Sequence, residues 1–252
     1  MYRRTVLVLG TLGVGGYAAI RYLPALIPSD FDLEELSDPA GFRSIAGGES
    51  SSAFNAFIGL PGNEVEASTP LVTEDEVRAD ICASLFGSDV PSDRVPVASF
   101  SDYYCPFCRV QTRALGDMAA TNSDGMMVKW HELPLLGETS ELAARVALAA
   151  DLQGQYTAFH EQLIRTPFQP NDAYIEQLAS SIGVDFGLLV QDMESETVRR
   201  QLETRKILSR IFRFVGTPAL VVGRTVVNGQ ISERQLRDII ELERSSNWRS
   251  IC

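Results

Sequence analysis

A pair of cysteines, Cys105 and Cys108, separated only by a proline and a phenylalanine, restricts the possible folds more than any other feature of the sequence. A short, mostly apolar stretch (VPVASF, 95–100) with the composition of a β-strand precedes the pair, and a stretch of helical composition (109–120) follows it. Pro106 suits the first turn of a helix, where a missing N–H group costs no hydrogen bond. We therefore expect the two cysteines at a junction between a strand and a helix.

Such a junction is a favourable place for thiol chemistry. Free N–H groups and the positive end of the helix dipole stabilise a thiolate there, and the thiolate is the form that attacks a disulfide. Cys105 is thus the predicted nucleophile, with an exposed sulfur and a lowered pKa, and Cys108 is the predicted resolving thiol. Two alternatives are half of a zinc site and an inert structural pair. The other two cysteines and the two histidines lack the spacing of zinc ligands, so no metal is predicted.

The order of the predicted elements indicates an α/β fold. The first strand and helix are followed by a second strand (126–133), by about 70 residues of helical pattern, and by two adjacent strands (218–223 and 224–229). A closing helix (232–246) completes the chain. The two late strands read as a hairpin, so the sheet is mixed, as in a thioredoxin-like fold that is interrupted by a helical insertion.

This order divides the chain into four predicted parts. The thioredoxin-like domain comprises 95–136 and 206–252, and the inserted helical domain comprises 137–205. A largely polar N-terminal extension, 28–94, precedes them, and 1–27 is a signal peptide or a membrane anchor.

The N-terminus has the pattern of an export signal. The basic sequence MYRR precedes sixteen uncharged residues, Thr5–Ile20, fewer than the roughly 20 that a spanning helix needs. Basic residues at this end predict that the remainder of the chain faces outside. In a bacterium that compartment is the periplasm, where the protein would be free or tethered to the inner membrane.

The extension is expected to have irregular structure except for its predicted helical segments. A short helix is predicted around 33–36. A longer one begins at Thr73, where Glu76 completes a capping box, and runs to about Phe86.

The net charge and the number of cysteines limit which partners and which disulfides are expected. A formal net charge of -11 opposes binding to phosphate backbones, so nucleic acid is not an expected partner. Four cysteines allow one working pair and one further pair. Because unpaired thiols are a hazard in an oxidising compartment, we expect a structural disulfide between Cys82 and Cys252, with free or intermolecular thiols as the alternative.

A second motif supports the redox interpretation. Thr217 and Pro218 stand immediately before the strand ALVVG. In a thioredoxin-like fold a proline here follows a cis peptide bond and faces the cysteine pair, which leaves the Thr217 backbone free to pair with an extended substrate. The alternative is a trans proline that merely begins a strand.

Three stretches together resemble the DsbA family of bacterial thiol:disulfide oxidoreductases. They are VASFSDYYCPFC, HELPLLGETSELAARVALAA and VGTPALVVGRTVVNGQIS. The resemblance implies that Cys105 attacks, that Cys108 is its partner, that Thr217 and Pro218 form the cis-proline loop, and that the inserted helices shape a substrate groove. The family often has an acidic residue six positions before the first cysteine, whereas this sequence has Ser99.

Other residues near the motif are weaker candidates. Asp102 serves in proton transfer or caps the active-site helix, and the cap is preferred. His131 is expected to be structural and His160 exposed. Tyr103 and Tyr104 either line the substrate groove or pack.

The predicted function is that of a periplasmic thiol:disulfide oxidoreductase, with no cofactor. Its expected partners are exported proteins with thiols or disulfides and a membrane redox partner. The alternatives are a disulfide isomerase or reductase, a non-redox peptide-binding chaperone module, and a metallochaperone that uses the cysteine pair.

Overall fold

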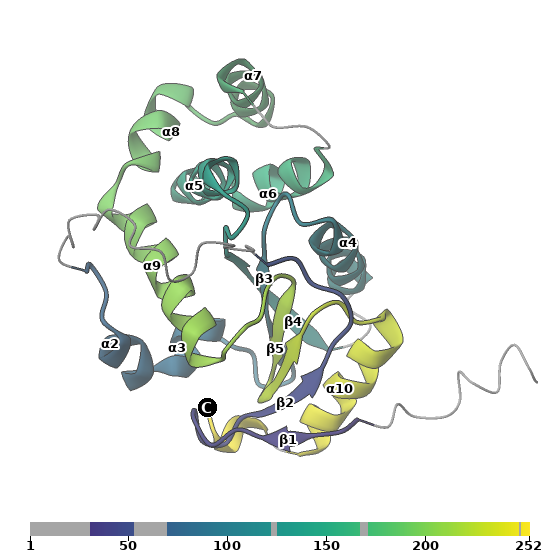
Figure 1. Ribbon diagram of the computed structural model, residues 1–252. Coiled ribbons are helices and arrows are strands. Elements are labelled where there is room, and N and C mark those ends of the chain that lie inside the picture. The colour runs from purple at the N-terminus through teal and green to yellow at the C-terminus, as the bar shows by residue number, and fades with distance from the viewer. Residues whose placement is uncertain (1–30, 53–69, 122–124, 167–170, 247) are drawn as a thin grey trace, which may run out of the picture. The chain divides into compact units, whose positions relative to one another are not determined.

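The structure of the protein is a computed structural model, which describes residues 31–52, 70–121, 125–166, 171–246 and 248–252 (Figure 1). All helices and strands in these ranges belong to one unit, Leu33–Cys252. The predicted signal or anchor, 1–27, lies outside the described residues. Within them, no helix has both the length and the apolar character needed to cross a bilayer.

A mixed sheet runs through the unit. Within the described residues it has six strands in the order β1-β2-β6-β5-β3-β4, in which β3 is parallel to β4 and antiparallel to β5. β2 pairs parallel with β6, and β5 and β6 form the expected hairpin. The strands are β1 (Glu34–Glu35), β2 (Arg43–Ala46), β3 (Val95–Ser101), β4 (Met126–Glu132), β5 (Ala219–Val222) and β6 (Thr225–Asn228).

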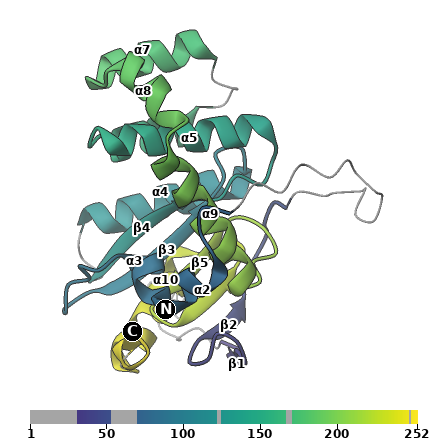
Figure 2. The same ribbon diagram turned by 90° about the vertical axis from the view of Figure 1, so that its left-hand side faces the viewer.

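Helices cover both faces of the sheet. Figures 1 and 2 show α4 and α10 on one face and α9, α2 and α3 on the other, with α5, α6, α7 and α8 grouped beyond one end of the strands. The helices are α2 (Glu74–Ala79), α3 (Ile81–Phe86), α4 (Pro106–Thr121), α5 (Glu138–Leu152), α6 (Tyr156–Arg165), α7 (Asp172–Ile182), α8 (Phe186–Met193), α9 (Glu196–Ile211) and α10 (Glu233–Ser245), with a 3₁₀ turn, η1 (Trp248–Ser250).

Strand β3, which lies between β5 and β4, explains the position of the cysteine motif. All seven of its residues are buried, because helices cover both faces of the sheet at this point. Its mostly apolar sequence suits burial on both faces. The chain leaves β3 at Ser101 and enters α4 at Pro106, so the motif lies at the strand-to-helix junction that the sequence predicts.

Helix α9 connects the two hydrophobic cores. Val198 and Leu202, in its first half, pack in a core with α5 to α8. Leu208 and Ile211, in its second half, pack in a core with the sheet and α3. The helix therefore crosses the boundary at 205 that the sequence suggests between the inserted helices and the thioredoxin-like domain.

The N-terminal extension differs most from its prediction. The helix expected around 33–36 is wrong, because Glu34 and Glu35 form β1 against β2. In β2 the Arg43 side chain is buried, and it forms a 2.6 Å salt bridge with Glu243, which is also buried. The extension thus adds two strands to the sheet, which its polar composition did not indicate.

The helix predicted from Thr73 to Phe86 is two helices. The Thr73–Glu76 capping box is present at the start of α2. Asp80 then interrupts the helix, because its side chain accepts a hydrogen bond from the N–H group of Ala83 and so caps a second helix, α3.

Candidate active site

Cys105 occupies the N-cap position of α4. Its carbonyl oxygen accepts the first helical hydrogen bond, from the N–H group of Arg109, at 3.3 Å. Its sulfur accepts a hydrogen bond from the N–H group of Cys108 at 3.2 Å, in the way that a capping side chain does. The thiol also lies 3.1 Å from the carbonyl oxygen of Thr217, to which it donates. Both cysteines of the pair are free thiols in the structure.

The surroundings give the two thiols different acidities. The hydrogen bond with the Cys108 side chain contributes most to lowering the pKa of Cys105 from 9.0 to about 6, and the Ser51 side chain and the N–H group of Cys108 add to the effect. Burial opposes it. Burial chiefly, and then the hydrogen bond with Cys105, raises the pKa of Cys108 well above the usual range of a thiol. At neutral pH the pair therefore contains one thiolate, at Cys105.

The expectation that the Cys105 sulfur is exposed is wrong. Neither Cys105 nor Cys108 has any exposed surface. The reason is that Thr217 and Ser51 both lie against Cys105, and Ser51 comes from the N-terminal extension.

The Thr217–Pro218 peptide bond is cis, as expected. The Thr217 backbone, however, is not free. Its N–H group donates to the carbonyl oxygen of Ser51 at 2.8 Å, and its own carbonyl oxygen accepts from the N–H group of Ser51 at 2.7 Å. These two bonds form an isolated antiparallel bridge. Nothing in the serine-rich stretch around Ser51 indicated this contact in the sequence.

Asp102 does not cap the active-site helix. One carboxylate oxygen accepts hydrogen bonds from the N–H group of Tyr104 and the hydroxyl of Ser140, each at 2.8 Å. The other accepts from the N–H groups of Leu135 and Leu136, at 2.7 and 3.0 Å. The buried carboxylate thus joins the loop before α4 to the segment before α5, which is why it is not available to α4.

A buried carboxylate that the sequence analysis missed lies at the end of β4. One oxygen of Glu132 accepts hydrogen bonds from the hydroxyls of Tyr103, at 2.8 Å, and Tyr156, at 2.5 Å. His160 Nδ1 lies 3.2 Å from the same oxygen. Glu132 ends a strand parallel to β3, on the same edge as the cysteine motif, and that position was the signal available in the sequence.

This cluster corrects two expectations about single residues. His160 is buried, not exposed, because it packs between Tyr103, Tyr156 and Trp130. Tyr103 is buried within the cluster and therefore packs; it does not line an open groove.

His131 and Ser99 lie in the buried interior. The His131 ring stacks on Phe100, with centroids 4.5 Å apart, and its Nε2 lies 2.7 Å from the carbonyl oxygen of Leu85. Burial lowers the pKa of His131 to about 3, so it stays neutral, which agrees with a structural role. The hydroxyl of Ser99 has no hydrogen-bond partner within the described part of the chain.

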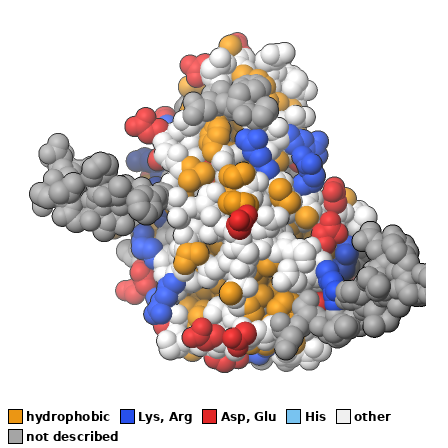
Figure 3. All heavy atoms as spheres, turned by 45° about the vertical axis from the view of Figure 1, so that its right-hand side comes forward, with side chains coloured by type: hydrophobic (Ala, Val, Ile, Leu, Met, Phe, Trp, Pro, Cys, Tyr) orange, Lys and Arg blue, Asp and Glu red, His pale blue; other side chains and the backbone are white. Residues whose placement is uncertain are grey.

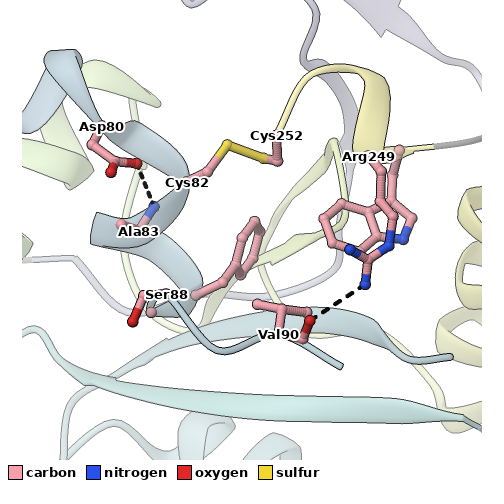
Figure 4. Close-up of a pocket in the computed structure, with 10 residues that line it drawn as sticks. Asp80, Cys82, Ala83, Ser88, Val90, Arg249 and Cys252 are labelled. Atoms are coloured by element: carbon pink, nitrogen blue, oxygen red, sulfur yellow. Dashed lines mark hydrogen bonds between the residues drawn. A yellow bond between two sulfur atoms is a disulfide. The ribbon is translucent and has the colours of Figure 1, made fainter. Parts of the chain in front are cut away.

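Cys82 and Cys252 form a disulfide, with their sulfur atoms 1.99 Å apart (Figure 4). It links α3 to the C-terminus, beside a cavity of about 360 Å³. Arg249, on the other side of this cavity, lies over the Trp248 ring at 4.7 Å and donates to the carbonyl oxygen of Pro91 at 2.6 Å. The disulfide therefore holds the C-terminal residues against the extension.

Most charged side chains on the face in Figure 3 lie nearer its edges, and hydrophobic groups are scattered down its middle. In the residues that the structure describes, no three His, Cys, Asp or Glu side chains are placed to hold a metal ion together.

A cis proline opposite a Cys-Pro-Phe-Cys pair at the start of a helix, within a mixed sheet of this order, defines the class of thioredoxin-fold redox proteins. Residues 96–241 match the DSBA-like thioredoxin domain family, and this range is more than half of the chain. The chain belongs to that family. It is therefore a thiol–disulfide oxidoreductase of the DsbA type.

Solved structures with the same fold include redox proteins from several bacteria. A thioredoxin-like oxidoreductase from Silicibacter pomeroyi DSS-3 is 32% identical, with a TM-score of 0.60 over 65% of this chain and 98% of its own. The thiol-disulfide exchange protein alpha-DsbA2 from Wolbachia pipientis is 20% identical, with a TM-score of 0.59 over 67% and 94%. The catalytic domain of Proteus mirabilis ScsC is 22% identical, with a TM-score of 0.57 over 69% and 99%. The last two are likenesses of fold alone. No curated protein matched the chain.

Proposed function

We propose that the protein is a periplasmic enzyme that forms or exchanges disulfides in exported proteins, with Cys105 as the attacked and attacking cysteine and Cys108 as its partner. The observation that carries this proposal is the asymmetry of the pair. The Cys105 sulfur accepts the Cys108 N–H group at the start of α4 and has a pKa of about 6, whereas the pKa of Cys108 is raised.

In the oxidative direction, a client thiolate attacks the sulfur of Cys105 in the Cys105–Cys108 disulfide. That bond breaks, and Cys108 leaves as a thiolate and takes up a proton. A second client thiolate then attacks the client sulfur of the mixed disulfide, so that the client gains a disulfide and Cys105 leaves as a thiolate. The enzyme pair is now reduced, and a membrane redox partner must accept its two electrons. No further cofactor is needed.

The low pKa of Cys105 favours this direction. A thiol of low pKa is a good leaving group, so resolution of the mixed disulfide releases Cys105 readily. A stabilised thiolate also stabilises the reduced pair and makes the disulfide more oxidising. The isomerase or reductase remains the second candidate, because the same pair can attack a client disulfide when a partner keeps it reduced.

The periplasmic location is supported by two independent features. The basic and then apolar N-terminus has the pattern of an export signal. The Cys82–Cys252 disulfide is of a kind that persists in oxidising compartments.

The test is the reduction potential of the Cys105–Cys108 pair in a glutathione series, with the Cys82–Cys252 pair resolved from it by alkylation and mass analysis. A reduction potential of about −120 mV supports a dithiol oxidase, and a potential below about −200 mV supports the isomerase or reductase. Cys105→Ser should abolish exchange. Retained protection of unfolded clients in that variant would support the peptide-binding module instead.

A further inference from the structure

The backbone of the cis-proline loop is already paired, and its partner is the chain's own Ser51. Both polar backbone groups of Thr217 are used in this bridge, at 2.7 and 2.8 Å. A client that added a strand here would need the same two groups, because strand addition depends on main-chain hydrogen bonds. Ser51 and an extended client peptide therefore exclude each other.

The side chain of Ser51 also acts on the reacting atom. It contributes to lowering the pKa of Cys105, while the Ser51 backbone pairs with Thr217 beside that sulfur. Serine differs from cysteine only in having oxygen in place of sulfur. Ser51 thus occupies the backbone position opposite Thr217 that a client cysteine would take next to Cys105, but its hydroxyl cannot form a disulfide.

The approach of Ser51 is close and depends on a glycine. A Cβ atom added to Gly216 would lie 2.4 Å from the carbonyl oxygen of Ser51, so no other residue fits while the bridge is formed. Other residues could adopt the backbone conformation of Gly216. The close contact with Ser51 is therefore the reason that this position requires glycine.

The segment that carries Ser51 continues from β2 along the end of β6. Gly47 donates to Asn228 at 3.0 Å, Gly48 donates to Gln230 at 2.7 Å, and Gln230 donates to Glu49 at 3.0 Å. β2 itself is anchored in the sheet. Detaching Ser51 alone breaks few hydrogen bonds, so the bridge can open while the strand behind it stays in place.

We propose that residues 50–52 are a built-in pseudosubstrate: an extended segment of a client protein displaces them, pairs antiparallel with Thr217, and places its cysteine where Ser51 now lies. This inference rests on the proposed function. It adds that the resting site is closed, and that the preferred client is an extended cysteine-containing segment able to compete for the Thr217 backbone.

A cysteine at position 51 tests the geometry. In the full chain with the Cys105–Cys108 disulfide formed, the S51C thiolate should attack the Cys105 sulfur, break that disulfide and release Cys108 as a free thiol, with no change in total oxidation. Peptide mapping should find position 51 linked to Cys105. The matched control is S52C, since neighbouring residues of an extended segment point in opposite directions and Ser52 is exposed. No link in S51C, or equal links in both variants, would overturn the inference.

A second pair of variants tests the competition. S51P removes the N–H group that donates to Thr217, and S52P removes one that has no backbone acceptor among the described residues. Loss of one hydrogen bond should open the site about fivefold more often, so S51P should raise the alkylation rate of Cys105 and lower the KM for a cysteine-containing peptide by about that factor. S52P should do neither. A rate and KM unchanged or worsened in S51P would contradict the pseudosubstrate.

These outcomes are separable from failure of the proposed function. If Cys105 and Cys108 form no disulfide in the unmodified protein, the redox proposal falls. If they form one and exchange with clients, but position 51 neither links to Cys105 nor competes with the peptide, only the pseudosubstrate falls.

Discussion

The lowered pKa of Cys105 determines how its reactivity should change with pH. With a pKa of about 6, about nine tenths of the side chain is thiolate at pH 7 and about one tenth at pH 5. A thiol with the unshifted pKa of 9.0 would be only about one hundredth thiolate at pH 7. Alkylation of Cys105 by iodoacetamide should therefore slow about tenfold from pH 7 to pH 5, with its midpoint near pH 6.

Removing the strongest contributor should move that midpoint. Cys108→Ala deletes the thiol that lowers the pKa of Cys105 most, and it leaves the N–H group of residue 108 in place. The ratio of alkylation rates at pH 6 and pH 9 should then fall about fivefold. Taking a ratio within one variant cancels the burial of Cys105, which limits access equally at both pH values.

The same shift has a consequence for stability. Because the pKa of Cys105 is lower in the folded than in the unfolded protein, its thiolate stabilises the reduced protein fully above pH 9, and this contribution is lost as the pH falls through about 6. The oxidised protein has no such titration. The stability of the reduced protein relative to the oxidised one should therefore decrease from pH 9 to pH 5.

The assay is mass-resolved alkylation of the reduced protein from pH 4 to pH 9, with thiolate absorbance as an independent readout. The matched control is Cys82→Ala with Cys252→Ala, since neither residue contributes to the pKa of Cys105. A midpoint at pH 8 or above, or a Cys108→Ala variant with an unchanged rate ratio, would refute the reasoning.

Three further predictions concern the scaffold. The Cys82–Cys252 disulfide closes a loop of 170 residues, so replacing both cysteines by alanine should lower the unfolding free energy in urea by up to about 5 kcal/mol without changing Cys105 alkylation. Asp102→Ala leaves four donors without their acceptor and should cost about 3 kcal/mol, with Asp102→Asn intermediate; equal stability would contradict the assigned bonds. His131 stays neutral in the folded protein and takes up a proton in the unfolded one. The free energy of unfolding should therefore be about 2 kcal/mol lower at pH 5 than at pH 7, and His131→Gln should abolish that difference.

The sequence by itself determined the fold class and the position of the reactive pair. Both depend on local chemistry: a buried strand reads as an apolar run, and a cysteine three residues before another at a helix start receives its N–H group whatever surrounds it. The cis bond at Pro218 followed from the combination of two motifs within one fold.

Only the tertiary structure decided what lies against that pair. Ser51 reaches Cys105 because β2 joins β6, a pairing between segments far apart in the chain that polar composition does not encode. Asp102 likewise accepts hydrogen bonds from residues just before α5, which lie far from it in the chain and reach it only through the packing of the fold. Contacts of this kind arise from how strands and helices pack, and packing depends on the whole chain at once, whereas capping and periodicity are set within a few residues.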